Sequence, residues 1–233
     1  MAQQQLREVR LVTFDVYSAL MNIEAALMAH TAAVWPYRSE AERAALVREW
    51  RRLQLEYTLI STLLGKGHLS FRTITQRALR VAMHRLHFRA SQAEQDVLVQ
   101  AWDELPPWPE ARDVLRRLRQ GPWELALLSN GDTEMLQAVA NTLGVDFDYI
   151  FSAEQAGVYK PHVAIYHLPV KQLGLSPHEI VHVAGAARDA MGAKAAGLRC
   201  VWVNRSHDLI LDPSFAPDVE LATLEPLPEV LTG

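Results

Sequence analysis

The feature that most constrains this chain is a regular alternation of helical patterns and short apolar runs from residue 108 onward. Each β-prone apolar run follows a stretch whose apolar residues recur at helical spacing. Repeated helix–strand order requires a parallel sheet with helices on both faces, so we expect an α/β fold with a doubly wound parallel sheet. The predicted helices are 109–119, 133–143, 162–173 and 188–196, and the predicted strands are 123–128, 149–152, 180–184 and 200–203. The proline-rich tail predicts one short strand and a last helical turn.

An all-helical block interrupts this alternation near the N-terminus. The apolar run 11–14 predicts a strand, but helical patterns follow it instead of a second strand. Capping boxes, in which a Glu follows a Ser by three residues, begin two of the helices, and the prolines from Pro106 onward end the block. The predicted helices are 22–35, 39–64, 70–86 and 91–105. We expect a four-helix cap domain, residues 22–105, inserted into a core domain formed by residues 1–21 and 106–233.

The composition limits the classes of function. Of the 233 residues 49% are hydrophobic and the net charge is -4, which is ordinary for a globular protein and lacks the basic surface that nucleic acids require. No apolar run approaches the roughly 20 residues of a membrane span, and the N-terminus lacks the apolar segment of a signal peptide. The single cysteine, Cys200, lies in a predicted buried strand and is expected to be inert. We expect a cytoplasmic protein without nucleic-acid or membrane partners.

Polar side chains stand where the predicted strands end. Asp15 follows the first strand, and Ser129 with Asn130 follows the second. Lys160 precedes a proline after the third strand, and Asp189 opens the helix after the fourth. Because the carboxyl ends of parallel strands meet at one edge of a sheet, these groups are expected to share one crevice.

Each of these residues has an ordinary explanation when taken singly. Asp15 fits the role of a loop carboxylate that accepts hydrogen bonds from backbone N–H groups, and residues 129–131 fit a turn. Lys160 fits the role of a solvated surface lysine, and Asp189 fits the preference for acidic residues in the first turn of a helix. Only the combination favours a catalytic site.

Together the four positions resemble the motifs of the haloacid dehalogenase superfamily: a strand-end nucleophilic Asp, a strand-end Ser or Thr, a Lys before Pro, and an acidic residue after the fourth strand. Within that superfamily the chain is most similar to the (S)-2-haloacid dehalogenases. Three stretches carry this similarity, namely 14–20, 50–58, and 158–161 with the Ile-Tyr pair at 165–166. The resemblance covers nearly the whole chain and implies a Rossmann-like core with an inserted helical cap.

The same comparison predicts a site without a metal. Phosphatases of the superfamily hold magnesium with an acidic residue two positions after the nucleophile and another at the tip of strand four. Here these positions are Tyr17 and Ala184, which offer no carboxylate to a hard cation. We therefore expect neither a metal nor another cofactor, and we do not expect phosphatase activity.

The resemblance implies a covalent mechanism. Asp15 would attack C2 of a small 2-haloacid in line, displace halide with inversion, and form an ester that is then hydrolysed. Lys160 would keep Asp15 ionised and oriented, and Asp189 would pair with Lys160.

The remaining site residues are implied to bind the substrate. Ser129 and the backbone N–H groups of Val16 and Tyr17 would hold its carboxylate, and Asn130 would polarise a carboxylate or oxyanion. Arg51 of the cap would receive the halide, although its place in the basic cluster 48–52 is also typical of a solvated helix face. Tyr166 would fix Lys160 or Asp15, although packing is the more common role of a tyrosine in a helix.

The chain departs from the dehalogenase pattern at several positions. Ser18 and Ala19 stand where the family has Gly-Thr, and Ser18 is expected to point away from Asp15 and not to replace the lost hydroxyl. Ala184, Ala186 and Arg188 stand where a Ser, an Asn and an aromatic residue are usual.

These departures leave three hypotheses open. The first is a haloacid-type hydrolase with altered activity. The second is a hydrolase acting on another 2-substituted acid, for example by ring-opening C–N cleavage, and the third is a protein that binds small acids without turnover. In each case the partner is a small carboxylic acid, and the relatives suggest a homodimer.

Overall fold

The computed structural model of the chain describes residues 8–65 and 67–232. Six strands form one parallel sheet in the order β3-β2-β1-β4-β5-β6, which confirms the predicted α/β fold. The predicted strand boundaries are correct to within one residue, and the short strand expected in the tail is β6. The strands are β1 (Leu11–Phe14), β2 (Glu124–Ser129), β3 (Tyr149–Ser152), β4 (Ile180–Ala184), β5 (Arg199–Val203) and β6 (Val219–Leu221).

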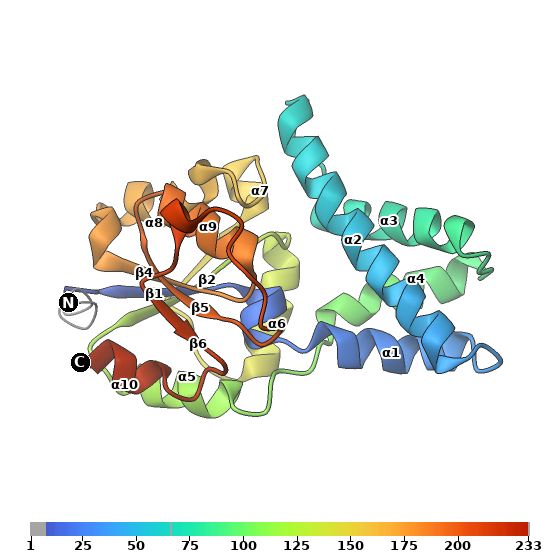
Figure 1. The fold of residues 1–233 in the computed structure, drawn as a ribbon, viewed down its shortest axis with the longest axis horizontal. Coiled ribbons are helices and arrows are strands. Elements are labelled where there is room, and N and C mark those ends of the chain that lie inside the picture. Colours follow the sequence, from blue (N-terminus) through green and yellow to red (C-terminus); the bar gives the residue numbers. More distant parts are fainter. Residues whose placement is uncertain (1–7, 66, 233) are drawn as a thin grey trace.

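Helices cover both faces of the sheet. The pair α5 (Ala111–Arg119) and α10 (Leu227–Thr232) packs on one face, and the pair α8 (Val163–Leu173) and α9 (Ala187–Ala195) packs on the other (Figure 1). Burial on both faces explains why the central strands are almost continuously apolar and carry no alternating pattern. The remaining elements of this part are α6 (Thr133–Leu143), α7 (Ala153–Ala156), η4 (Pro177–Glu179) and η5 (Pro213–Phe215).

A second group of helices stands beside the sheet and is here called the helical lobe (Figure 1). The capping boxes begin α2 (Glu40–Leu64) and α4 (Gln92–Gln100) as predicted. The fourth helix of this lobe is shorter than the predicted 91–105, because its last turn, Ala101–Asp103, is 3-10 helical. None of the described helices is both long and apolar enough to cross a membrane. The lobe consists of α1 (Ile23–Val34), α2 (Glu40–Leu64), α3 (Phe71–Arg85), α4 (Gln92–Gln100) and η3 (Ala101–Asp103).

Two short chain segments, 20–22 and 106–108, connect the helical lobe to the sheet and are here called the tether. Met21 and Pro107 form an antiparallel bridge. The Asn22 N–H donates to the Pro106 carbonyl at 2.8 Å, and the Trp108 N–H donates to the Leu20 carbonyl at 2.9 Å. The chain therefore enters and leaves the lobe at adjacent points.

The strand order also determines where a ligand can bind. From β1 the chain proceeds to β2 and β3 on one side, and β4, β5 and β6 lie on the other side. The crevice where the order reverses, beyond the carboxyl ends of β1 and β4, is the usual ligand site of such sheets. Asp15 follows β1 directly at this point.

Candidate active site

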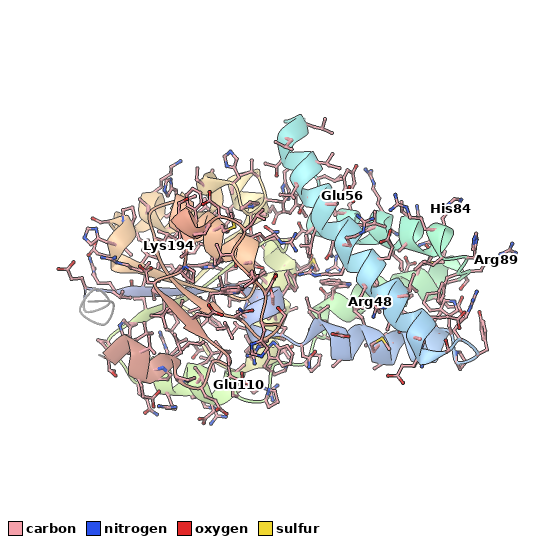
Figure 2. The ribbon with its side chains drawn as sticks, in the orientation of Figure 1. Arg48, Glu56, His84, Arg89, Glu110 and Lys194 are labelled. Carbon is pink, nitrogen blue, oxygen red and sulfur yellow. The ribbon has the colours of Figure 1, made fainter. Side chains whose placement is uncertain are left out.

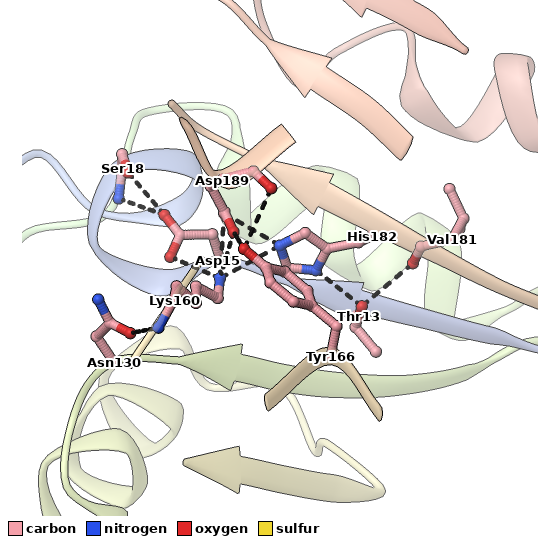
Figure 3. Close-up of polar contacts among 9 residues, drawn as sticks. All are labelled: Thr13, Asp15, Ser18, Asn130, Lys160, Tyr166, Val181, His182 and Asp189. Atoms are coloured by element: carbon pink, nitrogen blue, oxygen red, sulfur yellow. Dashed lines mark hydrogen bonds and ion pairs between the residues drawn. The ribbon is translucent and has the colours of Figure 1, made fainter. Parts of the chain in front are cut away.

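Asp15 is held at the start of a tight turn. Its N–H donates to the Val183 carbonyl at 2.9 Å, and the chain then forms the π-helical turn η2 (Val16–Leu20). This turn brings Ser18 back over the carboxylate, so that its N–H and its hydroxyl donate to Asp15 Oδ2 at 3.0 and 2.7 Å (Figure 3). The prediction that Ser18 points away from Asp15 is therefore wrong. A side chain three residues after a carboxylate at a helix N-terminus lies within reach of it.

Gly185 allows this turn to pack against the end of β4. A Cβ atom at that position would lie 2.3 Å from the Ala19 nitrogen and 2.3 Å from the Ser18 carbonyl carbon, which is too close for any side chain. The close approach leaves Ala19 fully buried. Any residue larger than glycine at position 185 would displace the turn that orients Asp15.

Lys160 lies between the two carboxylates of the site. Its Nζ is 3.2 Å from Asp15 Oδ1 and 3.0 Å from Asp189 Oδ1, and only 6% of the Lys160 side chain is exposed (Figure 3). The explanation of Lys160 as a solvated surface lysine is therefore wrong. Its backbone N–H donates to Asn130 Oδ1 at 2.8 Å, so the amide oxygen of Asn130 is engaged and its amino group remains for a ligand.

Asp189 is the most heavily bonded carboxylate of the site. The Tyr166 hydroxyl donates to Asp189 Oδ1 at 2.7 Å, and its ring lies 5.7 Å from Lys160 Nζ. Tyr166 therefore contacts Lys160, as expected, and also orients Asp189. Burial alone would raise the pKa of Asp189, but the Lys160 charge and the His182 ring hold it well below its usual range. Gly192 lets the tyrosine approach, since a Cβ there would be 2.5 Å from the Tyr166 hydroxyl.

His182 is a site residue that the sequence did not suggest. It is fully buried in the middle of β4, and its Nε2 lies 3.0 Å from Asp189 Oδ2 and 3.2 Å from Lys160 Nζ (Figure 3). Its Nδ1 is 2.9 Å from the hydroxyl of Thr13, the residue opposite it on β1. The only available signal was a histidine in an otherwise apolar strand.

The surroundings of His182 keep its ring neutral. Burial lowers the pKa of His182, the nearby Asp189 raises it, and the Lys160 charge lowers it again, with a net shift below the usual value. The ring of Tyr166 packs edge-on against it at 5.5 Å, and Cys200 is its neighbour on β5. A neutral ring leaves Lys160 as the cation that the two carboxylates share.

A small cavity opens in front of Asp15, with a volume of about 40 Å³. Its walls come from β1 and η2, from the ends of the other strands, and from α2 and α3 of the helical lobe. Six predicted site residues line it: Asp15, Tyr17, Arg51, Asn130, Lys160 and Asp189. The other lining residues are Ser18, Leu55, Thr58, Leu59, Phe71, Ala186 and Arg188. The structure therefore brings six of the nine predicted site residues together around one cavity.

Arg51 reaches this cavity from α2. Its Nη1 donates to Gln54 Oε1, and its guanidinium lies 5.2 Å from the ring centre of Trp102. Burial, followed by the charge of Arg188, lowers the pKa of Arg51 to about 10, so it stays a cation at neutral pH. The solvated face of α2 carries Arg52 instead, which pairs with neighbouring glutamates. The explanation of Arg51 as a solvated helix charge is therefore wrong.

Three predicted residues lie behind the cavity. Tyr166 contacts Asp189, and Val16 is fully buried at the start of η2. Ser129, the last residue of β2, is fully buried, and its hydroxyl has no hydrogen-bond partner within 8–65 and 67–232. The Tyr17 hydroxyl is buried and unpartnered in the same way, and burial raises its pKa well above its usual range. Tyr17 lines the cavity, whereas Ser129 lies behind it.

The geometry defines a class of protein. A carboxylate at the end of β1, held by a lysine and faced by an arginine from an inserted helical lobe, is arranged to attack a small molecule. The family model of the haloacid dehalogenase-like hydrolases matches residues 9–197. The chain belongs to this family.

Particular relatives are similar over nearly the whole chain. (S)-2-haloacid dehalogenase 2 of Pseudomonas sp. (strain CBS-3) is 31% identical over 97% of this chain and 97% of its own. (S)-2-haloacid dehalogenase 4A of Burkholderia cepacia is 32% identical over 93% and 89%. The structure of L-2-haloacid dehalogenase from Xanthobacter autotrophicus with chloropropionic acid covalently bound has a TM-score of 0.85 and 27% identity, covering 97% of this chain and 99% of that one.

Proposed function

We propose that the protein is a 2-haloacid dehalogenase that acts on the (S) enantiomers of small 2-haloacids through an ester on Asp15. The observation that carries this proposal is the environment of the Asp15 carboxylate. Lys160 and Ser18 hold its two oxygens, and the cavity in front of it is small and is lined by Arg51 from the helical lobe. The covalent adduct of the Xanthobacter autotrophicus relative supports the same chemistry.

The reaction proceeds in two balanced steps. A carboxylate oxygen of Asp15 forms a bond to C2 as the C2–halogen bond breaks, and the halide leaves with the bonding electrons. Water then adds to the Asp15 carboxyl carbon, and the C–O bond of the acyl group breaks. The products are an inverted 2-hydroxy acid, one halide ion and one proton, and Asp15 is restored as a carboxylate.

The neighbours of Asp15 supply charge and orientation. Lys160 pairs with Asp15 and orients it, and Asp189, itself held by Tyr166, positions Lys160. Arg51 receives the departing halide, because it is the cation that the helical lobe contributes to the cavity.

The substrate carboxylate needs hydrogen-bond donors of its own. The unpartnered Ser129 hydroxyl and the N–H groups of Val16 and Tyr17 at the start of η2 supply them. The amino group of Asn130 faces the same cavity and stabilises the oxyanion that forms when water attacks the ester.

The division into domains is part of the proposal. We assign residues 22–105 to a cap domain and residues 1–21 and 106–233 to the core, of which residues 1–7 and 233 lie outside the described part. The antiparallel tether supports this division, because both crossings between the two parts occur there.

Chloride release tests the proposed function. The wild-type protein should release chloride from (S)-2-chloropropionate, and Asp15→Asn should abolish release because an amide is not a nucleophile at this carbon. Asp113→Asn, at an exposed carboxylate on α5, is the matched control and should retain activity. Chloride release by Asp15→Asn, or none by the wild type, would refute the proposal.

A single turnover in water labelled with oxygen-18 tests the ester. The first 2-hydroxy acid formed should be unlabelled, because its hydroxyl oxygen comes from Asp15, and the label should appear in the Asp15 carboxylate. Label in the first product would show direct attack by water instead.

A further inference from the structure

The cavity contains a second arginine that the proposed reaction does not use. Arg188, in the first turn of α9, lines the same cavity as Asp15 and Arg51 but comes from the core side of it. Neither arginine forms an ion pair with a carboxylate within the described part of the chain. Arg188 also has no hydrogen-bond acceptor there, whereas Arg51 has Gln54.

The carboxylates of the site are already satisfied without these arginines. Asp15 is bound by Lys160 and Ser18, and Asp189 by Lys160, Tyr166 and His182. Two guanidinium groups therefore line one small space, and neither is paired with a carboxylate. The Arg188 side chain is also exposed to solvent, and the carboxylate of Asp208 acts on its charge from outside the cavity.

The two positive charges act on each other. Burial and then the charge of Arg188 lower the pKa of Arg51. Burial also lowers the pKa of Arg188, where the carboxylates Asp189, Asp15 and Asp208 only partly offset it. An anionic ligand group beside Arg188 would relieve this repulsion.

From this arrangement, and resting on the proposed function, we propose that the substrates are 2-haloacids with a second anionic group, and that Arg188 binds that group. The C1 carboxylate is bound by neutral donors at Ser129 and η2, and the halide goes to Arg51. Arg188 is then the group that meets the substituent on C2, and guanidinium binds a carboxylate through two parallel hydrogen bonds. The substrate class is the 2-halodicarboxylic acids.

The surroundings of Arg188 leave room for such a substituent. Ala186, two residues earlier, is small, and it lines the cavity together with Arg188. Both residues also border an open groove of about 530 Å³, which is lined further out by Asp208 and by apolar residues such as Leu209 and Phe215. A substrate that extends beyond C3 therefore has space in the direction of the Arg188 side chain.

The test compares a dicarboxylic acid with its uncharged isostere. Chloride release is measured with (S)-2-chlorosuccinate and with 2-chloro-4-methylpentanoate of the same spatial arrangement, in which an isopropyl group replaces the second carboxylate. The wild-type protein should favour the diacid by roughly tenfold or more in kcat/KM, the value of one bidentate charged contact. Arg188→Gln should remove that preference mainly by raising KM for the diacid, and Arg188→Lys should retain part of it.

Two controls make the result specific. Arg48→Gln removes an exposed charge of α2 outside the cavity (Figure 2) and should leave the ratio of the two substrates unchanged. Calorimetric binding of the products (R)-malate and (R)-lactate needs no turnover, and malate should bind more tightly to the wild type but not to Arg188→Gln.

The outcomes separate the two proposals. If 2-chloropropionate is dehalogenated but the diacid is not preferred over its isostere, or if Arg188→Gln keeps the preference, the role of Arg188 is refuted and the proposed function stands. If no chloro acid releases chloride, the proposed function fails, and tighter binding of malate that depends on Arg188 still supports this inference. Equal binding of malate and lactate to the wild type would overturn it.

Discussion

At the scale of single residues, the orientation of Asp15 depends on a hydroxyl that comes from an unexpected position. Ser18 donates to the same carboxylate oxygen through its backbone and its side chain. Because the residue that follows it is Ala19, Ser18 is the side chain of this turn that offers a hydroxyl to Asp15.

Removing this hydroxyl should slow the reaction without unfolding the protein. Ser18→Ala should lower kcat by roughly ten- to a hundredfold, because a hydrogen bond to a charged group contributes about 1.5–3 kcal/mol. The measurement is steady-state chloride release at saturating substrate. Ser206→Ala, at an exposed serine, is the control, and an unchanged kcat in Ser18→Ala would contradict the assigned contact.

His182 should make the folded state sensitive to mild acid. The pKa of His182 is lowered in the folded protein from the ordinary 6.5. Below pH 6.5 the histidine is therefore protonated more in the unfolded chain than in the folded protein. The free energy of unfolding should therefore fall as the pH falls below about 6.5, by at most about 1.4 kcal/mol per pH unit. The pKa of Asp189 is lowered from the carboxyl range, so protonation of Asp189 affects the free energy of unfolding only at more acidic pH.

Urea unfolding about one pH unit above and about one unit below 6.5 measures this effect. His182→Asn should show a smaller difference between the two conditions than the wild type, whatever its absolute stability. His84→Asn, at an exposed histidine of α3 (Figure 2), should behave like the wild type. An equal pH difference in His182→Asn would show that its titration is not coupled to folding.

The charged residues of the site were predictable from the sequence, whereas two of the residues that hold them were not. Asp15, Lys160 and Asp189 were predictable as neighbours, because parallel strands bring their carboxyl ends to one edge. Ser18 was not, because its direction depends on a π-helical turn that no sequence pattern indicates. His182 was not predictable either, since a buried polar residue within a strand becomes informative only when its partners are known.

At the scale of elements, one contact joins the first turn of α3 to the core. The backbone N–H groups of Phe71 and Arg72 donate to the Asp132 carboxylate at 2.8 and 3.0 Å. These N–H groups have no partner inside the helix, and a negative charge is favoured at a helix N-terminus. Phe71 lines the cavity, so this contact places a wall of the active site.

Asp132→Ala should destabilise the protein by about 1–2 kcal/mol, because two partly buried N–H donors at the helix start lose their acceptor. Amide hydrogen exchange should accelerate in the first turn of α3 more than in α5, which reports the loss of the local contact. Asp113→Ala is the matched surface control. Unchanged exchange at residues 71–73 would show that the carboxylate does not hold the helix.

The elements themselves follow closely from the sequence, and their exceptions have physical causes. Helix starts at 39 and 91 were predictable because a capping box satisfies the end of a helix locally. The short helix α7 was not predicted, because four residues carry no periodic pattern. The contact between Asp132 and α3 was also hidden, since it joins residues about sixty positions apart.

At the scale of the whole molecule, the active site lies where the helical lobe meets the core that contains the sheet. Asp15, Lys160 and Asp189 belong to the core side, whereas Arg51, Leu55 and Phe71 belong to the helical lobe. The two crossings of the tether are joined by the two hydrogen bonds of one antiparallel bridge, and its two prolines restrict its backbone.

Loosening the tether should therefore change binding and turnover together. The double change Pro106→Gly with Pro107→Gly should lower kcat/KM by roughly tenfold, with effects on both kcat and KM, because the cap residues are positioned less well. Pro213→Gly in the exposed turn η5 is the control. If the tether variant keeps wild-type kinetics, the hydrogen-bonded geometry and not the prolines sets the position of the cap.

The assembly state remains a prediction at this scale. Light scattering of the purified protein should give twice the chain mass of 26.2 kDa if the expected homodimer forms. A mass equal to one chain would refute the dimer.

The adjacent crossing points of the tether have a consequence for protein engineering. Since the intervening 80 or so residues begin and end side by side, they form a cassette that can be exchanged between relatives without rerouting the sheet. Grafting a foreign cassette would replace Arg51 and the apolar wall while keeping the nucleophile and its lysine. Such chimeras would separate the part of the molecule that performs the chemistry from the part that selects what reacts.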